Sequence, residues 1–195
     1  PRIDHSGIYL FIIIAYQEVQ MATSTFLIRN ETPEDHSVIS QVTIEAFRPL
    51  GFEILNEPYI IEALRAAGAL TISLVAEIDH RVIGHIAFSP VTVSDGTPDW
   101  YALGPVSVLP EYQRTGIGRA LIYAGLERLK AMHAKGCCLV GHPEYYGKVG
   151  FIHPSGFYYE GVPAELFFAI SFDGQYPQGA VTFHEGFTAI SSPSN

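Results

Sequence analysis

Apolar positions along the chain recur with alternating strand-like and helix-like periods from residue 26 onward. The run "FLIRN" at 26–30 predicts a short strand, and the next apolar positions follow a helical period. Thr32 as N-cap and Pro33 at the first helical position predict a helix over 33–47. A second helix is predicted over 57–67, because its apolar positions share one face and a glycine follows its end.

Two β-rich runs then follow, "ALTISLVAEID" at 69–79 and "RVIGHIAFSPVTV" at 81–93, joined at "DH". This spacing predicts a hairpin with a short turn. The run "YALGPVSVL" at 101–109 predicts a further strand. Gly104 and Pro105 interrupt it, and an interior proline in a paired strand commonly marks a bulge or an edge.

The remaining pattern predicts a long helix from Gly116 to about Lys135, a buried strand "CCLVG", a short helix "PEYYGKVG" and a last clear strand "AELFFAISF". The C-terminal tail is expected to add one strand at most. The resulting order is β-α-α-β-β-β-α-β-α-β. Hairpins mixed with crossover helices indicate an α/β (α+β) fold with helices packed around a mixed sheet.

The 195 residues suffice for one domain with a sizeable core. The formal net charge is −9, which disfavours nucleic acid or an anionic membrane surface as partners. The apolar run at 7–16 is about half the length that a membrane-spanning helix needs. Met21 resembles a natural start, so residues 1–20 are interpreted as an extension and residues 21–195 as the single domain.

The chain has two cysteines, the adjacent pair Cys137 and Cys138. Neighbouring cysteines rarely pair with each other, because the ring they would close is strained. We therefore expect reduced thiols in a strand and a cytoplasmic location. No metal site is expected, since the histidines and cysteines lack the spacing of metal ligands.

The segment "QRTGIG" at 113–118 lies between a predicted strand and the mouth of a predicted helix. The first N–H groups of a helix have no intrahelical partner, and the glycines leave them accessible. Together with Arg114 they predict an anion cradle. A nucleotide P-loop is disfavoured because Arg119 and Ala120 follow, and a dinucleotide fingerprint is disfavoured because it needs three glycines.

Three further segments accompany this loop: the strand "VSV" at 106–108, the linker "LPEYQ" and the downstream "PEYYGKVGF" at 143–151. In this order and with this separation, the sequence from about residue 25 to 172 resembles the GNAT superfamily of acyl-coenzyme A N-acetyltransferases. The resemblance implies a mostly antiparallel central sheet, splayed between its fourth and fifth strands and flanked by helices.

The resemblance also implies roles for individual residues. Backbone groups of Val106, Ser107 and Val108 would hold the pantetheine arm of acetyl-CoA, and the Val108 N–H would polarise the thioester carbonyl. Tyr146 would protonate the departing thiolate. The pyrophosphate would be held by the loop and helix start, with amides from Arg114, Thr115, Gly116, Ile117, Gly118 and Arg119, while Gln113 lies in the same loop and could instead orient it.

The general base is open at this level. Glu111, Glu144, His142 and Glu53 are candidates, and each could equally be a solvated surface group. His142 directly follows the fifth strand and is the favoured base or substrate contact.

The leading hypothesis is direct transfer of an acetyl group from acetyl-CoA to a primary amine of a small molecule. The alternatives are a catalytically inactive sensor that binds acyl-coenzyme A and a peptide or protein N-acetyltransferase. The oligomeric state is open, and a homodimer is one possibility. Three aromatic and acidic segments, 47–57, 94–100 and 158–165, are expected to form the acceptor side.

Overall fold

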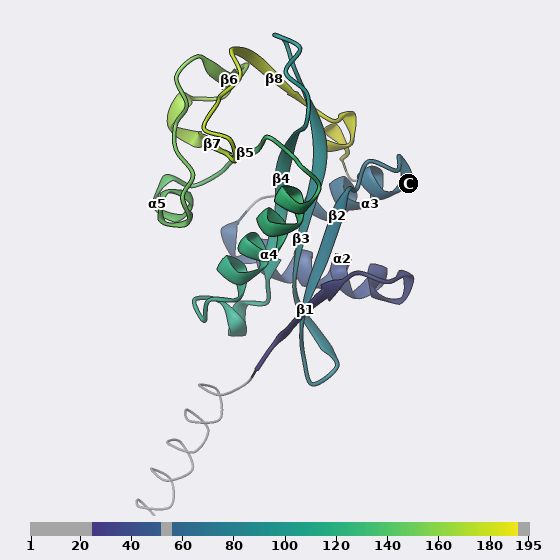
Figure 1. Cartoon of the computed structure of the whole chain (residues 1–195). Helices are drawn as coiled ribbons and strands as arrows, with labels where there is room; N and C mark the ends of the chain where they lie inside the picture. Colours follow the sequence, from purple (N-terminus) through teal and green to yellow (C-terminus); the bar gives the residue numbers. More distant parts are fainter. Residues whose placement is uncertain (1–24, 52–55, 191–195) are drawn as a thin grey trace, which may run out of the picture.

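A computed structural model describes residues 25–51 and 56–190, which build one twisted sheet with helices on both faces (Figure 1). The sheet contains β1 Leu27–Asn30, β2 Ile72–Ile78, β3 Arg81–Val93, β4 Trp100–Val108, β5 Gly136–Val140, β6 Phe157–Tyr159, β7 Phe167–Ser171 and β8 Gly179–Phe183. The α-helices are α2 His36–Phe47, α3 Glu57–Ala66, α4 Ile117–Ala131 and α5 Pro143–Tyr146. Short 3₁₀ turns are η1 Pro33–Asp35, η2 Arg48–Leu50, η3 Pro110–Tyr112, η4 Gly147–Val149, η5 Ala164–Leu166 and η6 Glu185–Thr188.

The first four strands form an antiparallel meander in the order β1-β2-β3-β4. The hairpin between β2 and β3 turns at Asp79 and His80, whose φ angles of 47° and 63° are left-handed. Two consecutive left-handed residues are the geometry of a tight hairpin turn, which matches the twist of the strands. The predicted hairpin is therefore confirmed.

A β-bulge interrupts the pairing of β3 with β4. Ile86 lies opposite Val106 and Phe88 opposite Leu103, so Gly104 and Pro105 together face one residue of β3. Beyond this point β4 has no pairing with β5, because the parallel register of these strands covers only Trp100, Tyr101 and Ala102 of β4. The predicted bulge and the predicted separation of the fourth and fifth strands are confirmed.

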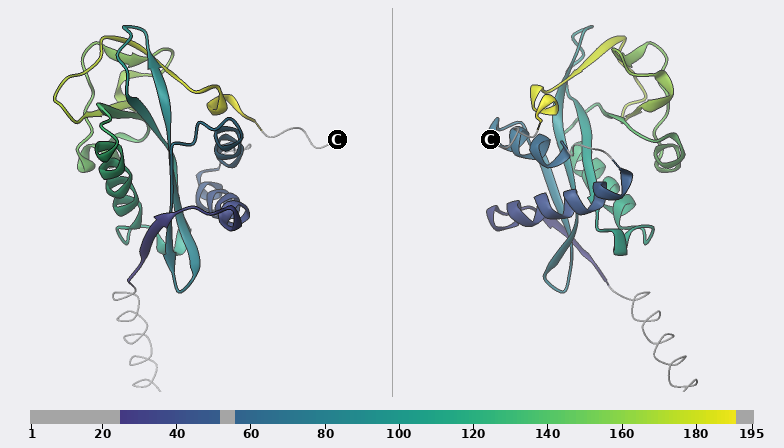
Figure 2. Two further views of the ribbon diagram at one scale, coloured as in Figure 1. Left: turned by 45° about the vertical axis from the view of Figure 1, so that its right-hand side comes forward. Right: turned by 180° about the vertical axis from the view of Figure 1, so that it is seen from behind.

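Helices α2 and α3 cover one face of the sheet, and α4 covers the other (Figure 2). Thr32 and Asp35 form a capping box before α2, in which the Thr32 N–H donates to Asp35 Oδ2 at 2.8 Å. The predicted start at Pro33 is correct, although the first turn is 3₁₀ rather than α-helical. On the opposite face, α4 lies so close to β3 that a Cβ on Gly125 would overlap the Phe88 ring.

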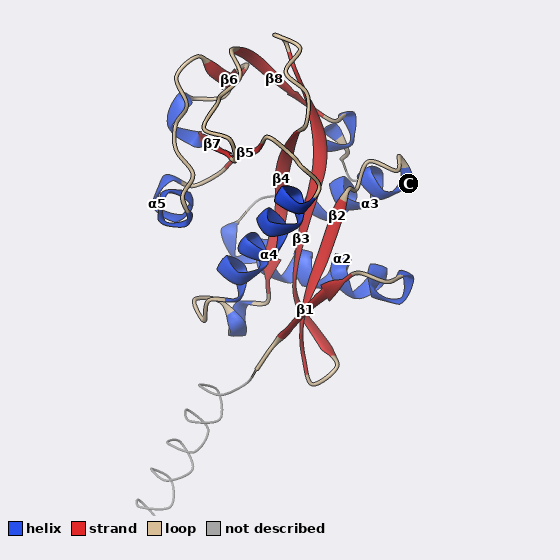
Figure 3. Ribbon diagram, in the orientation of Figure 1, coloured by secondary structure: helices blue, strands red, loops and turns tan. Residues whose placement is uncertain are grey.

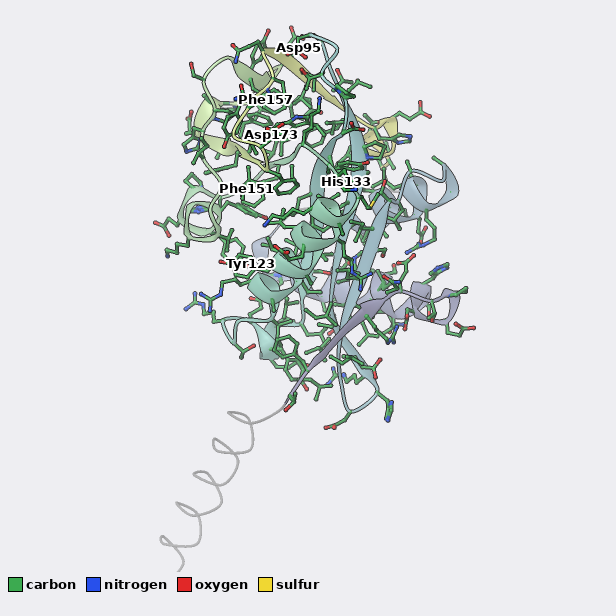
Figure 4. The ribbon with its side chains drawn as sticks, viewed as in Figure 1. Asp95, Tyr123, His133, Phe151, Phe157 and Asp173 are labelled. Carbon is green, nitrogen blue, oxygen red and sulfur yellow. The ribbon has the colours of Figure 1, made fainter. Side chains whose placement is uncertain are left out.

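The C-terminal segments form a second, smaller core beside the main one. Trp100, Phe157, Phe167 and Val181 pack together there, with the Trp100 and Phe157 rings 5.0 Å apart. Strand β2 pairs with β3 only as far as Phe88, and the following residues Val91 to Val93 of β3 pair with β8 (Figure 3). Asp95, labelled at the hairpin tip in Figure 4, anchors this segment by accepting a hydrogen bond from the Gln178 N–H.

The predicted order of elements agrees with the structure, with β8 as the added C-terminal strand. Two predictions need correction. The three-residue strand β6 was not predicted, and α4 ends at Ala131 rather than near Lys135, because His133 has a left-handed φ of 62°. The predicted extension at 1–20 lies outside the described residues. Within the described ranges, no helix combines the length and apolarity that crossing a membrane requires.

Candidate active site

A cavity of about 1220 Å³ extends from the gap between β4 and β5 to the surface of α3. Its volume exceeds the roughly 300–1,000 Å³ that is usual for a single small-ligand site. The lining residues come from β4, the 113–119 loop, the end of β5, α5, α3 and the C-terminal segments. Elements far apart in the sequence therefore meet around one space.

The backbone of β4 presents unpaired groups to this cavity. The Leu109 N–H donates to the Ile83 carbonyl of β3 at 2.9 Å. Since successive residues of an antiparallel strand direct their N–H and C=O groups to opposite sides, those of Val106 and Val108 point away from β3, toward the gap. The Val108 carbonyl accepts a hydrogen bond from Gln113 Nε2 at 3.0 Å, whereas its N–H is left facing the cavity.

Ser107, between these two residues, lies differently. Its backbone falls on the side that pairs with His85 of β3, and its side chain is 2% exposed beneath α2. There its hydroxyl lies 3.2 Å from Thr43 Oγ1. Ser107 therefore fixes β4 against α2, and it does not line the cavity.

The 113–119 loop carries the unpaired N–H groups that the sequence predicts. Gly116 is the N-cap of α4 with a left-handed φ of 96°, and Arg114 is also left-handed at 63°. Thr115 ties the loop down by donating from Oγ1 to the Tyr112 carbonyl at 2.6 Å. Ala120 is the first residue of the helix start whose N–H reaches a backbone acceptor, the Gly116 carbonyl at 2.9 Å. The preceding amides are thus available for an anion.

Gly118 and Tyr145 meet at the edge of this loop. A Cβ placed on Gly118 would lie 3.0 Å from the Tyr145 hydroxyl and 3.7 Å from Val108 Cγ2. Tyr145 thus brings its hydroxyl to the first turn of α4. Gln113, Arg114, Thr115, Gly116, Gly118 and Arg119 all line the cavity, whereas the Ile117 side chain is buried in the core.

Tyr146 is the last residue of α5 and also lines the cavity. Its ring packs edge-on against Tyr145 and Phe151, with centroids 5.1 and 6.0 Å away. Gly141 allows this position, because a Cβ there would overlap the ring. Burial raises the pKa of the Tyr146 hydroxyl well above its usual range, so that the phenol keeps its proton at neutral pH. It can therefore act as a proton donor.

Of the four predicted general-base candidates, His142 lines the cavity. Glu111 instead pairs with Arg81 at 3.1 Å, and Glu144 is exposed outside the lining. Glu53 lies outside the described residues. The carboxylate among the described lining residues is Glu57, the first residue of α3, which the sequence predicts as a helix start and as the end of one acceptor segment.

The predicted acceptor segments are brought together in part. Phe47 and Glu57 from the first segment line the cavity, as do Tyr159 and Val162 from the third. Residues 94–100 do not line it, since they anchor β8 and bury Trp100 in the second core.

Phe183 and Phe187 take their place in the lining. Sequence reasoning missed both residues, because a C-terminal tail carries no signal of where it folds back.

The two cysteines are buried in β5, and burial raises the pKa of both thiols. Neither lines the cavity. In the described part of the chain, no cluster of three or more His, Cys, Asp or Glu side chains is arranged to hold a metal ion.

Comparison with known proteins now identifies the family. The model of the acetyltransferase (GNAT) family matches residues 38–151. This chain belongs to the GNAT family. The match covers the anion cradle, both tyrosines and the splayed strands, so the resemblance inferred from these motifs is confirmed.

Individual GNAT relatives agree with this result. A GNAT family acetyltransferase from Brucella melitensis, crystallised with acetyl-CoA, is 45% identical, with a TM-score of 0.75 over 84% of this chain and 99% of its own. The E. coli protein YhbS, crystallised with CoA, has a TM-score of 0.75 at 30% identity, covering 84% of this chain and 92% of its own. In sequence, the uncharacterised N-acetyltransferase YhbS of E. coli K12 is 36% identical over 64% of this chain and 72% of its own length. The predicted fold and the acyltransferase class are thereby confirmed.

Proposed function

We propose that this protein transfers the acetyl group of acetyl-CoA directly to a primary amine of a small molecule. The observation that carries the proposal is one continuous cavity. It joins the anion cradle at the start of α4, the free backbone edge of β4 and the aromatic side chains Phe47, Tyr159, Phe183 and Phe187. A two-substrate transfer needs these three parts in one space.

The donor end of the cavity suits coenzyme A in charge and shape. The unpaired amides at the start of α4, together with Arg114 and Arg119, provide a positive site for a pyrophosphate. The Val106 and Val108 backbone groups, turned away from β3, can pair with the amides of a pantetheine arm. Crystals of the Brucella and E. coli relatives with acetyl-CoA and CoA support the same use of the site here.

The chemistry follows from two groups of this chain. The Val108 N–H donates a hydrogen bond to the thioester oxygen, where negative charge develops as the amine attacks. The Tyr146 hydroxyl is protonated at neutral pH, so it can donate a hydrogen bond to the sulfur and pass its proton as the C–S bond breaks and the thiolate departs. His142 lines the same cavity and is the candidate to accept the proton of the attacking amine, directly or through water.

Direct transfer is favoured over an acyl-enzyme because both thiols are buried away from the cavity. A nucleophilic cysteine needs an accessible thiolate, and burial keeps Cys137 and Cys138 neutral. The amine nitrogen therefore attacks the thioester carbonyl carbon directly.

An acceptor screen tests the proposal. Purified protein is mixed with acetyl-CoA and with separate panels of small amines and N-terminal peptides, and release of the coenzyme A thiol is measured. We expect thiol release with members of the small-amine panel. Release confined to peptides would indicate a peptide N-acetyltransferase, and coenzyme A binding without any release would indicate a binding module.

A further inference from the structure

We propose that Glu57 is the acceptor-binding carboxylate, and that it holds the ammonium group of a compact amine with an apolar or aromatic body. The inference rests on the proposed transfer reaction and names the class of amine that enters the acceptor end. Four features of the cavity lead to it: a buried oxygen, a separation of charge, an aromatic wall and the position of that wall beside β4.

Glu57 lines the cavity and has a carboxylate oxygen that no described residue uses in a hydrogen bond. One of its carboxylate oxygens, Oε2, is buried and has no hydrogen-bond partner among the described residues. An unpartnered buried carboxylate oxygen is costly, because it has lost its water without gaining a donor. An ammonium group has three donors and a positive charge, so it would satisfy this oxygen.

Charge is distributed unevenly along the cavity wall. The described lining residues with cationic side chains are Arg114 and Arg119 at the anion cradle and Lys148 after α5, and none of them comes from α3. Glu57 is the carboxylate of the described lining, and it comes from α3. The cavity is therefore suited to an anion at the α4 end and to a cation at the α3 end.

Aromatic rings surround the α3 end. Tyr159 and Phe183 are stacked with centroids 4.6 Å apart and an angle of 12° between the rings, and Phe183 meets Phe187 edge-on at 5.0 Å. Phe47 and Ile60 complete the apolar surface, with Ile60 three residues after Glu57 and so on the same side of α3. We call Tyr159, Phe183 and Phe187 the aromatic wall. Such rings attract a cation and also pack against the apolar body that carries it.

The aromatic wall lies next to the strand that would hold the thioester. A Cβ on Gly104, at the β4 bulge, would be 4.0 Å from Phe187 Cε1. The free N–H of Val108 is four residues further along the same strand. The aromatic wall therefore borders the strand that would hold the thioester, and an amine bound against this wall enters the same cavity as the donor.

Binding of 2-phenylethylamine to the protein loaded with coenzyme A tests the proposal by calorimetry. Its neutral counterpart 2-phenylethanol and the anion phenylacetate are the comparisons. We expect the amine to bind about tenfold more tightly than the alcohol, and phenylacetate more weakly still. Failure of the amine to bind, or phenylacetate binding as tightly as the amine, would overturn the proposal.

Glu57→Gln keeps the shape of the side chain and removes its charge. We expect this variant to lose about tenfold in amine affinity while its affinity for the alcohol changes by less than about twofold. Glu62→Gln removes the same charge from an exposed position of α3 and should change neither affinity. Unchanged amine affinity in Glu57→Gln would rule out the assignment. Glu57→Asp, expected to be intermediate, and coenzyme A affinity as a measure of folding keep the result interpretable.

Thiol release from acetyl-CoA with the same amine separates the two proposals. Binding that depends on Glu57 without thiol release would refute the transfer reaction and leave the ammonium site standing. Thiol release that is equal in Glu57→Gln and in the unaltered protein would support the transfer reaction and refute the role of Glu57.

Discussion

The two ends of the cavity are built in different ways. The donor end consists of backbone groups from one continuous stretch, the end of β4 and the 113–119 loop. The acceptor end consists of side chains from α2, α3, β6, β8 and η6. The family model matches residues 38–151 and so includes the donor end entirely, whereas the aromatic wall lies beyond it.

This difference has a physical basis. Backbone amides are the same whatever the side chain, so a donor end made of them requires mainly glycines and a helix start. An acceptor end made of side chains changes its specificity with each substitution. We therefore expect coenzyme A binding to depend on main-chain geometry, and the choice of amine to depend on side chains such as Glu57 and those of the aromatic wall.

The largest effect is expected from a charge placed in the anion cradle. Gly118→Asp would put a carboxylate against the Tyr145 hydroxyl and among the amides that we propose to bind the pyrophosphate. We expect coenzyme A affinity to fall about 100-fold, or about 2.7 kcal/mol, measured by calorimetry. Tyr123→Asp adds the same charge to an exposed position of α4 and serves as the control. Equal affinities of the two variants would contradict the assignment of the cradle.

Next in size is the effect of removing the phenol between the two ends. Tyr146→Phe keeps the ring packed on Phe151 and removes the proton donor. We expect kcat to fall about 100-fold while coenzyme A affinity stays within about twofold. Tyr145→Phe is the matched variant, because its hydroxyl lies at Gly118, and there KM for acetyl-CoA should rise instead. An unchanged kcat in Tyr146→Phe would remove this residue from the chemistry.

A smaller effect is expected at the aromatic wall. Phe187→Leu keeps an apolar side chain but loses the ring that faces Gly104 and packs edge-on against Phe183. KM for the amine should rise about fivefold, with KM for acetyl-CoA unchanged. Steady-state kinetics with each substrate varied in turn checks this. A change in the acetyl-CoA value alone would show that the ring serves the donor end.

The smallest effect is expected at the buried thiols. If the donor and acceptor ends meet directly, the double variant Cys137→Ala, Cys138→Ala should keep kcat within about twofold, although lost packing in β5 lowers its stability by about 1–2 kcal/mol. Thiol-release kinetics and thermal unfolding measure the two effects separately. Loss of turnover in a folded double variant would favour an acyl-enzyme.

The sequence predicted best those features that depend on a few neighbouring residues. The hairpin at Asp79 and His80, the bulge at Gly104 and Pro105 and the cap at Thr32 each leave a signal within a few residues. The end of α4 has no such signal, because no glycine or proline occurs between Ala131 and Gly136, and the helix stops through the left-handed conformation of His133. Three-residue β6 exists only because it can pair with β8, which no local pattern reports.

The same contrast holds within the site. The loop residues Gln113 to Arg119 and Tyr146 were predicted from contiguous motifs, and all of them except Ile117 line one cavity. Glu57 belonged to a segment expected on the acceptor side but was not singled out, because an acid at the first position of a helix is explained by the helix dipole alone. Ser107 was included because it lies within the motif, although strand alternation turns its side chain to α2.

Strand β3 connects the two ends of the cavity and sets the spacing between them. Near its start Gly84 lies opposite Val108, and near its end Val91 is the first residue paired with β8. At about 3.3 Å per residue, these positions are separated by about 23 Å along the strand. The length of β3 thus sets the distance between the two ends of the cavity. Deleting one residue from β3 would shorten this distance and turn every following side chain to the opposite face of the sheet.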